Sequence, residues 1–248
     1  MVIEEPETIN FGKVGWEEGR MGISLKPLKL SFTALPFLLL FGGLISAYAA
    51  GPSGGNKLAP KQREEFLRRL EGNLKASKTL QAKFVQRKHL SIFQDVLVSS
   101  GSLTFAAPSR LRWEITAPFN SLLIMDGREL AKYDFSGGKP RRLKLPAVDA
   151  LHEALDQIAG LHQGKFSEQA KNYAMAVYMG ETARLVLVPK SKKMKRFIPE
   201  IEMEFSNALD SVKSVMIREG DSDFTMIVFE EIRLNPELPD NLFAPEFK

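Results

Sequence analysis

The segment from residue 99 to residue 117 alternates apolar and polar side chains on both sides of a short turn that contains a proline. Its apolar positions are Leu103, Phe105, Leu111, Trp113 and Ile115. Successive side chains of a β-strand point to opposite faces of the sheet, so this period of two predicts a hairpin with one apolar face. An isolated hairpin is at best marginally stable, and the apolar face therefore needs further structure to cover it.

The same period recurs along most of the chain and predicts roughly nine or ten antiparallel strands joined by short turns. Asp126 and Gly127 form a favoured hairpin turn between two of these strands. The other strands are expected at residues 80–85, 122–125, 129–134, 173–179, 184–188, 200–205, 212–218 and 224–234. Because twisted open sheets of about 10 strands curl, we expect a half-closed β-barrel of about 10 to 11 strands.

Two segments instead show the three- and four-residue spacing of one-sided helices. Residues 60–78 place Phe66 and Leu70 on one stripe, and residues 146–160 place Leu151 and Leu155 on another. Each apolar stripe needs an apolar surface, which the inside of the curled sheet offers. The expected fold class is therefore α+β, mainly antiparallel β, with a helical lid over a hydrophobic cavity.

Methionine is frequent in the expected strands, where its flexible thioether chain adapts to irregular shapes. Filling of an ordinary core is one interpretation of these methionines. A cavity for flexible alkyl chains is the other, since apolar pockets in barrel mouths are common ligand sites. On that hypothesis the cavity is lined by Phe84, Leu103, Phe105, Leu111, Trp113, Ile115, Met175, Met179, Met203 and Met226.

The sequence lacks the residue patterns of known catalytic sites. It has no cysteine, and its three histidines are far apart in the sequence, without the spacing of a zinc site. Neither a glycine-rich phosphate loop nor a Gly-x-Ser-x-Gly motif is present. We therefore expect a binding protein rather than an enzyme, with no metal and no cofactor.

The chain is mildly basic, with 34 Lys and Arg residues against 30 Asp and Glu residues. The densest basic cluster comprises Lys190, Lys192, Lys193, Lys195 and Arg196, between two expected strands. We interpret it as a solvated loop, with an anionic partner or lipid headgroup as the alternative. No aromatic residues interleave the cluster, so nucleic acid is not an expected partner.

The N-terminal residues predict export. Lys26 and Lys29 precede an apolar run over residues 34–45, and Ala47-Tyr48-Ala49 is a small-x-small cleavage signal. The run is shorter than the roughly 20 residues of a membrane span. We expect translation to start at Met21, residues 1–49 to be an N-terminal extension and signal peptide, residues 50–59 a flexible linker, and residues 60–248 one domain in the periplasm.

Several short motifs resemble the periplasmic outer-membrane lipoprotein carrier family, LolA. They are Phe-Val-Gln at 84–86, Gly101, Leu103, Pro108, Leu-Arg-Trp at 111–113, Pro118, Asp-Gly at 126–127, Tyr-Asp at 133–134 and, from Leu234, LNPELPDNLF. The resemblance implies an incomplete barrel with a helical lid and a cavity for acyl chains. It also implies a carrier, expected to be a monomer, that takes lipoproteins from an inner-membrane releasing transporter to an outer-membrane acceptor.

One position departs from the family pattern. The family has an arginine before the proline of the second hairpin, where this chain has Ala107 before Pro108. In the family that arginine tethers the lid to the barrel, so a more easily opened lid is expected here. Two alternatives stay open: a carrier of another lipid or glycolipid product, and a lipid-sensing regulatory module of the same fold.

Overall fold

The structure, a computed structural model, describes residues 55–93, 95–135, 138–145, 160, 164–219 and 222–244. Its helices are α1 (Pro60–Lys75), α3 (Phe166–Gln169), α4 (Lys192–Lys195) and the 3₁₀ helix η1 (Asp240–Phe243). Its strands are β1 (Asn56–Lys57), β2 (Thr79–His89), β3 (Leu97–Ala106), β4 (Arg110–Ala117), β5 (Ser121–Asp126), β6 (Glu129–Asp134), β7 (Arg141–Leu143), β8 (Tyr173–Met179), β9 (Ala183–Pro189), β10 (Glu200–Phe205), β11 (Val212–Glu219) and β12 (Asp223–Leu234).

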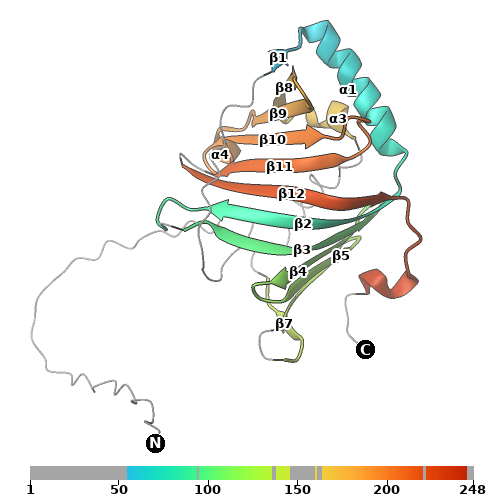
Figure 1. Cartoon of the computed structure of the whole chain (residues 1–248), viewed down its shortest axis with the longest axis vertical. Helices are drawn as coiled ribbons and strands as arrows, with labels where there is room; N and C mark the ends of the chain where they lie inside the picture. The colour runs from blue at the N-terminus through green and yellow to red at the C-terminus, as the bar shows by residue number, and fades with distance from the viewer. Residues whose placement is uncertain are drawn as a thin grey trace, which may run out of the picture. The chain divides into compact units, whose positions relative to one another are not determined.

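All these strands form one antiparallel sheet in the order β1-β8-β9-β10-β11-β12-β2-β3-β4-β5-β6-β7. The strands β1 and β7 end this order, so the sheet is open. It also curves, and β4 and β5 lie behind β2 and β3 in Figure 1. The expected incomplete antiparallel barrel is thus confirmed.

The expected strands agree closely with the structure, and β6, β8 and β10 have the expected bounds. The sheet nevertheless has twelve strands, where about 10 to 11 were expected. The expected boundaries omit β1 and β7, which have only two and three residues. Strands this short contain too few residues to show a period of two.

Two glycines occupy positions that other residues would strain, one in a close strand pair and one in a turn. A Cβ atom built on Gly101 would lie 1.8 Å from the carbonyl oxygen of Glu114. The register between β3 and β4 shifts at this point, between Ser100 and Gly101. Gly127 has a φ of +59° in the turn from β5 to β6, a conformation that strains residues with a side chain.

The sheet has two distinct faces, and we call the one that carries Phe84 and Leu185 the inner face. Two buried clusters lie on it. The first contains Leu70, Leu74, Phe166, Tyr173, Val177, Ala183, Leu185, Leu187, Met203, Phe205, Leu209 and Val212. The second contains Leu80, Ala82, Phe84, Leu103, Phe105, Leu111, Leu123 and Met125. Phe229 packs against both, so the two clusters form one continuous apolar region of the inner face.

Helix α1 packs on the first cluster. Pro60 at its start has the φ that a first helical turn needs, and the Gln62 side chain accepts a hydrogen bond from the backbone N–H of Ala59 at 3.1 Å. Leu70 and Leu74 are 0% and 1% exposed. The apolar stripe expected of this segment therefore faces the sheet, which stabilises the helix more than its intrinsic propensity does.

The opposite face, the outer face, is covered near β4 and β5 by the C-terminal segment. Phe243 of η1 is 1% exposed and packs with Leu122 and Ile124. The Arg110 guanidinium lies 5.1 Å from the Phe243 ring centre, and Arg112 donates a hydrogen bond to the Leu242 carbonyl at 3.4 Å. Both arginines thus point away from the inner face, as the alternation of the hairpin implies.

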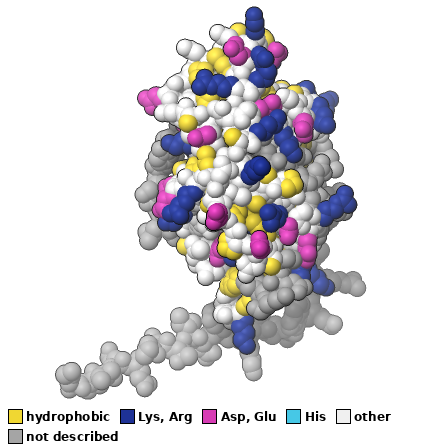
Figure 2. Space-filling view, turned by 90° about the vertical axis from the view of Figure 1, so that its right-hand side faces the viewer, with side chains coloured by type: hydrophobic (Ala, Val, Ile, Leu, Met, Phe, Trp, Pro, Cys, Tyr) yellow, Lys and Arg dark blue, Asp and Glu magenta, His cyan; other side chains and the backbone are white. Residues whose placement is uncertain are grey.

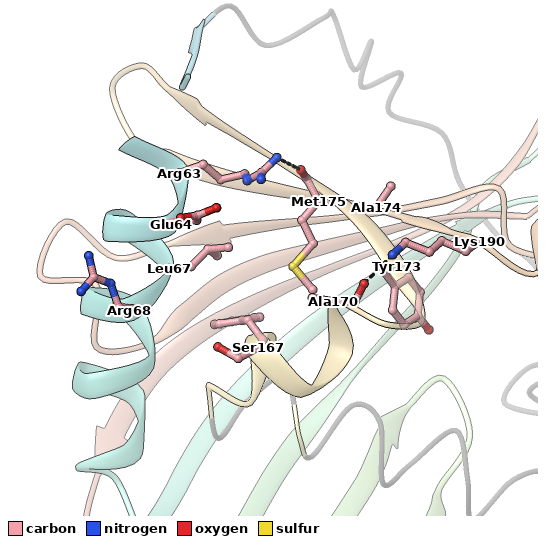
Figure 3. Close-up of a pocket in the computed structure, with 11 residues that line it drawn as sticks. Arg63, Glu64, Leu67, Arg68, Ser167, Ala170, Tyr173, Ala174, Met175 and Lys190 are labelled. Atoms are coloured by element: carbon pink, nitrogen blue, oxygen red, sulfur yellow. Dashed lines mark hydrogen bonds between the residues drawn. The ribbon is translucent and has the colours of Figure 1, made fainter. Parts of the chain in front are cut away.

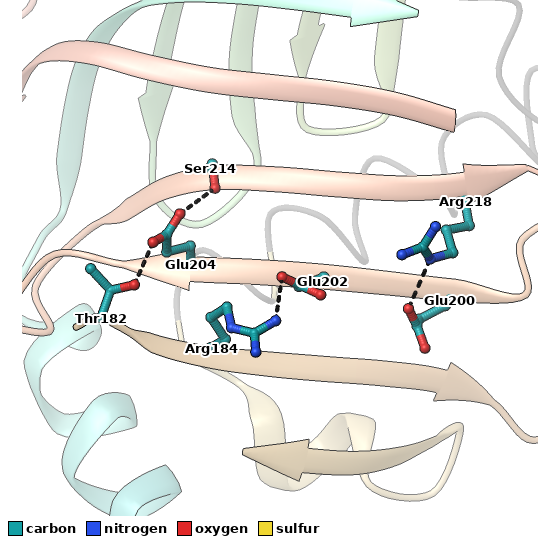
Figure 4. Close-up of polar contacts among 7 residues, drawn as sticks. All are labelled: Thr182, Arg184, Glu200, Glu202, Glu204, Ser214 and Arg218. Carbon is teal, nitrogen blue, oxygen red and sulfur yellow. Dashed lines mark hydrogen bonds and ion pairs between the residues drawn. The ribbon is translucent and has the colours of Figure 1, made fainter. Parts of the chain in front are cut away.

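Polar pairs cross the outer face of β9, β10 and β11. Arg184 pairs with Glu202 at 2.8 Å, Arg218 pairs with Glu200 at 3.0 Å, and Glu204 accepts hydrogen bonds from Thr182 and Ser214 (Figure 4). The outer face of these strands is therefore solvated, while the inner face carries the apolar surface. On the side of the molecule shown in Figure 2, charges of both signs are interspersed with hydrophobic side chains.

Two further observations concern particular segments. The basic residues that were expected to form a loop include a single helical turn, α4, for which the Ser191 hydroxyl accepts a hydrogen bond from the Met194 N–H. None of the helices in the described ranges is both long and apolar enough to cross a bilayer.

Candidate functional site

Three aromatic rings form the centre of the inner face. The ring centres of Phe84 and Trp113 are 4.2 Å apart, and the edge of Trp113 meets Phe229 with the centres 6.5 Å apart. Phe84 is only 1% exposed. The three rings come from β2, β4 and β12. The antiparallel register brings them together, because Phe84 pairs with Phe229 on one side and with Gly101 on the other. The arrangement offers a dry apolar surface.

The structure brings most of the proposed cavity residues to this face. Phe84, Leu103, Phe105 and Leu111 belong to the second cluster, and Trp113 and Ile115 pack against it. Met203 is 4% exposed within the first cluster, and Met175 packs against that cluster. Met179 lies in the same strand at an even spacing from Met175, but it is 38% exposed where β8 meets β1. All of these residues occupy inner-face positions.

Met226 is the exception, and its expected place in the cavity is wrong. It pairs with Met216 of β11, which pairs in turn with Glu202 of β10. Its neighbours Thr225 and Ile227 point to the inner face, so Met226 points to the outer one. The expectation failed because apolar residues follow one another through most of β12, which hides the period of two.

Of the four expected lid residues, the structure describes two, Phe66 and Leu70. Phe66 and Leu70 of α1 contact the first cluster, together with residues of β8 to β11. They are not among the residues of the second cluster, which holds the β3–β4 hairpin. Leu151 and Leu155, with the expected second helix, lie outside the described residues.

The inner face becomes polar toward one end of β2 and β12. Gln86 is 3% exposed and Thr225 is 7% exposed. Lys88 forms an ion pair with Glu219 at 2.7 Å, and the Thr225 hydroxyl donates a hydrogen bond to that same carboxylate at 2.6 Å. The buried Ser99 hydroxyl, on the strand beside Gln86, has no hydrogen-bond partner among the residues that the structure describes. Such a group offers an unused hydrogen bond to a bound molecule.

This polar end was missed in the sequence, although a signal for it exists. The alternation that places Leu80, Ala82 and Phe84 on the inner face continues without interruption to Gln86 and Lys88. Extending the period past the last apolar residue would have placed both polar side chains inside. The same extension places Ser99 of β3 and Glu219 of β11 on the inner face, but only the pairing of strands shows that all four residues lie at the same end.

A further charged residue lies at an inner-face position on β6. Lys132 pairs with Leu123 of β5 and with Leu143 of β7. Burial lowers the pKa of the Lys132 amine, while the nearby Asp134 carboxylate acts in the opposite direction. The inner face therefore carries a partly desolvated amine near its β7 edge.

A separate pocket of about 640 Å³ lies between α1, α3 and β8. We call it the α1–β8 pocket. Figure 3 shows Leu67 of α1 and Met175 of β8 directed into it, with Arg63 and Lys190 at its rim, whereas the guanidinium of Arg68 lies on the far side of α1. Arg63 donates a hydrogen bond to the Met175 carbonyl at 3.3 Å, and Lys190 donates one to the Ala170 carbonyl at 2.6 Å. No group of three metal-ligating side chains occurs in the described part of the chain.

The comparison with protein families identifies the family of this chain. A family model described as outer membrane lipoprotein carrier protein LolA matches residues 75–246. The chain belongs to the LolA family. The match includes β2 to β12 and therefore the whole apolar inner face, whereas almost all of α1 precedes it.

Curated relatives and a solved structure are similar to this LolA-family chain. An outer-membrane lipoprotein carrier protein from Nitrosomonas europaea is 29% identical over 167 residues, which are 66% of this chain and 77% of the relative. One from Chromobacterium violaceum is 28% identical over 209 residues, or 84% of this chain and 92% of the relative. The crystal structure of a LolA superfamily protein from N. europaea matches with a TM-score of 0.39 and 11% identity, covering 73% and 96% of the two chains.

Proposed function

We propose that this protein is a periplasmic, non-enzymatic carrier that holds the acyl chains of lipoproteins against its inner face and moves them from the inner to the outer membrane. The observation that carries the proposal is the continuous apolar surface through Phe84, Trp113 and Phe229. Membership of the LolA family, whose described member carries outer-membrane lipoproteins, supports the same function. Burial of each methylene group of an acyl chain contributes about 0.8 kcal/mol to binding.

The polar end of the inner face favours an amphiphilic ligand over a plain hydrocarbon. Acyl chains attached through ester or amide bonds carry carbonyl groups at one end. The Ser99 hydroxyl can donate a hydrogen bond to such a carbonyl, and the Gln86 amide lies in the pairing position on the next strand. Chains that pack on Phe84 would then place their linkage near these two residues.

Binding requires the structure to open. Leu103 and Leu111 are each 6% exposed and Phe105 is 3% exposed, so their surfaces are excluded from water in the described state. An acyl chain reaches them only after another part of the protein moves away. The carrier thus alternates between a closed empty state and an open loaded state, and the free energy of closure opposes loading.

The proposed pathway includes export and two partners. Residues 1–49 act as the extension and cleavable signal and residues 60–248 as one binding domain. Within the expected linker 50–59, Asn56–Lys57 form β1 and pair with β8, so this part of the segment belongs to the sheet and is not a flexible linker. A lipoprotein-releasing transporter of the inner membrane loads the carrier, which acts as a monomer, and an outer-membrane acceptor unloads it. No cofactor takes part, because the transfer makes and breaks no covalent bond.

A binding experiment on the exported protein tests this proposal. We expect the chain in the periplasmic fraction of a Gram-negative host, with an N-terminus near Ala50 by sequencing. A triacylated lipopeptide should displace a dansyl-labelled fatty acid from it, while the same peptide without acyl chains should not. Recovery of full-length chain in the membrane fraction would contradict the localisation, and equal displacement by both peptides would contradict acyl-chain binding.

A second prediction concerns Ala107, the position that departs from the family pattern. Ala107 packs against the second cluster, and its N–H donates a hydrogen bond to the Lys78 carbonyl, just after α1, at 2.8 Å. An arginine there is expected to reach carbonyls at the end of α1 and hold the closed state. Each such charged hydrogen bond is worth roughly 1.5–3 kcal/mol.

We therefore expect Ala107→Arg to weaken binding of the dansyl fatty acid by about tenfold or more. Fluorescence titration measures this affinity, and circular dichroism confirms that the variant is folded. Ala107→Gln serves as the control, because it adds length without charge and should have a smaller effect. Unchanged or tighter binding by folded Ala107→Arg would show that this position does not govern opening.

A further inference from the structure

Apolar side chains are exposed at the turn of the β2–β3 hairpin. Ile92 is 81% exposed and Phe93 is 45% exposed, both in the turn after β2, and Val98 of β3 is 44% exposed. These are three of the five large hydrophobic side chains that are exposed in the described ranges. A single exposed hydrophobic residue needs no explanation, whereas several on one hairpin indicate a contact surface. We call Ile92 and Phe93 the apolar tip.

Hydrogen bonds hold the apolar tip in a defined conformation. The Phe93 N–H donates a hydrogen bond to the Leu90 carbonyl at 2.9 Å, which closes a turn. The Ser91 N–H donates another to the Asp223 carboxylate at 2.7 Å and so ties the turn to the start of β12. A preformed contact surface loses less conformational entropy on binding than a flexible one. The tip is therefore built to present its apolar side chains to a partner.

The densest basic cluster of the chain lies at the same end of the sheet. It belongs to the connection between β9 and β10, which includes α4. One continuous line of paired residues joins β2, β12, β11 and β10, namely His89, Phe224, Arg218 and Glu200. The apolar tip follows His89, and the basic connection precedes Glu200, so both leave the sheet at one end (Figure 1). Three strand spacings, about 15 Å in total, separate them along the sheet.

The cations of this connection are exposed and lack carboxylate partners. Met194 of α4 packs against the first cluster, so this helical turn has one side toward the protein. Lys192, Lys195 and Arg196 are exposed, and none of them forms an ion pair with a carboxylate in the described ranges. These three cations outnumber the exposed carboxylate of the β2–β3 turn, that of Asp95. The basic connection therefore favours an anionic partner.

An anionic phospholipid bilayer meets the requirements of both features. Exposed apolar side chains enter the boundary between headgroups and acyl chains, and lysine and arginine side chains are attracted to the phosphate headgroups of the same surface. The tip and the basic connection contribute from separate turns at one end of the sheet, so a broad surface can contact both at once. A bilayer is such a surface, and it is also where acylated molecules begin and end their transfer.

We propose that this end of the sheet docks on an anionic phospholipid bilayer, with the apolar tip inserted and the α4 cations on the headgroups. The polar end of the inner face, at Gln86 and Ser99, lies toward the same end of β2 and β3. Docking therefore brings the binding face of the protein close to the membrane. The inference goes beyond the proposed function, because it does not depend on which molecule the inner face holds.

Sedimentation with sucrose-loaded vesicles tests the proposal on the exported chain. We expect binding to vesicles of equal parts phosphatidylglycerol and phosphatidylcholine, and much weaker binding to phosphatidylcholine alone. Ile92→Ser/Phe93→Ser and Lys192→Glu/Lys195→Glu should each weaken binding about tenfold or more. The matched variant Lys61→Glu/Lys75→Glu makes the same charge change at exposed positions of α1, at the other end of the sheet (Figure 1), and should bind within about threefold of wild type.

Tryptophan fluorescence gives a second readout that reports insertion directly. On addition of the anionic vesicles, emission of Phe93→Trp should shift to shorter wavelength, and lipids with brominated acyl chains should quench it. The wild type, with Trp113 in the inner face, gives the background signal. Circular dichroism confirms that each variant is folded.

The opposite results would overturn the proposal. Equal binding to both kinds of vesicle, equal losses in the two charge variants, or Phe93→Trp emission without quenching would exclude docking through this end. If the wild type did not bind vesicles at all, the apolar tip would be a surface for a protein partner instead. Lipopeptide displacement of the dansyl fatty acid should be unchanged in Ile92→Ser/Phe93→Ser, which separates a failure of docking from a failure of the carrier function.

Discussion

Replacing Ile115 by glutamate is expected to reduce lipopeptide binding by about a hundredfold or more. Ile115 occupies an inner-face position of β4, opposite Gly101, and packs against the second cluster. It is only half-buried, so a carboxylate there can reach water while the carrier is empty. When acyl chains cover it, the charge is left without a partner, which costs several kcal/mol. Displacement of the dansyl fatty acid by the triacylated lipopeptide measures the loss.

The neighbouring residue provides the matched control. Thr116 is exposed on the outer face of the same strand, and its hydroxyl donates a hydrogen bond to the Ser100 carbonyl at 3.3 Å. Thr116→Glu adds the same charge one residue away and should change lipopeptide affinity by less than about threefold. If both variants lost affinity equally, overall charge rather than the inner face would govern binding. If Ile115→Glu bound normally, acyl chains would not cover this part of the sheet.

The fold was largely predictable because strand alternation is a local signal. From Glu129 to Asp134 and from Glu200 to Phe205, the period and the flanking turns alone define both ends of a strand. The order of strands follows from hairpins joined one to the next. The pairing of β2 with β12 does not, since it joins Phe84 to Phe229 across most of the chain. Such long-range pairing leaves no mark in either segment by itself.

The candidate site was predictable only in its apolar part. Leu103, Leu111 and Trp113 could be assigned to one face, because the neighbouring positions of both strands are polar or charged and the alternation fits only one face. Met226 could not, because the mostly apolar middle of β12 fits either face. The α1–β8 pocket depends on how α1 packs beside an edge of the sheet, so no segment of the sequence indicates it.

Truncating the central ring of the inner face should have the largest effect on stability. Phe84 is 1% exposed, its ring centre lies 4.2 Å from that of Trp113, and it pairs with Phe229 of β12. Phe84→Ala removes most of this contact, and neighbours on three strands cannot collapse into the space. We expect a loss of about 3–5 kcal/mol in the free energy of unfolding. Urea denaturation followed by circular dichroism measures it as a lower midpoint with an unchanged slope.

Val85, next to Phe84, serves as the control that separates the effect of burial on the inner face from the general effect of a substitution in β2. Val85 lies on the outer face of the same strand and is only half-buried, so Val85→Ala removes less apolar surface and should cost clearly less than Phe84→Ala. Equal losses from the two variants would mean that the rings of the inner face do not form the core. Any ligand that binds the folded chain stabilises it, so the wild type with the same acylated ligand is the reference. If the ligand raises the free energy of unfolding of Phe84→Ala by more than that of the wild type, the ligand gains contacts in the space that the ring leaves, which would place the acyl chains beside Trp113.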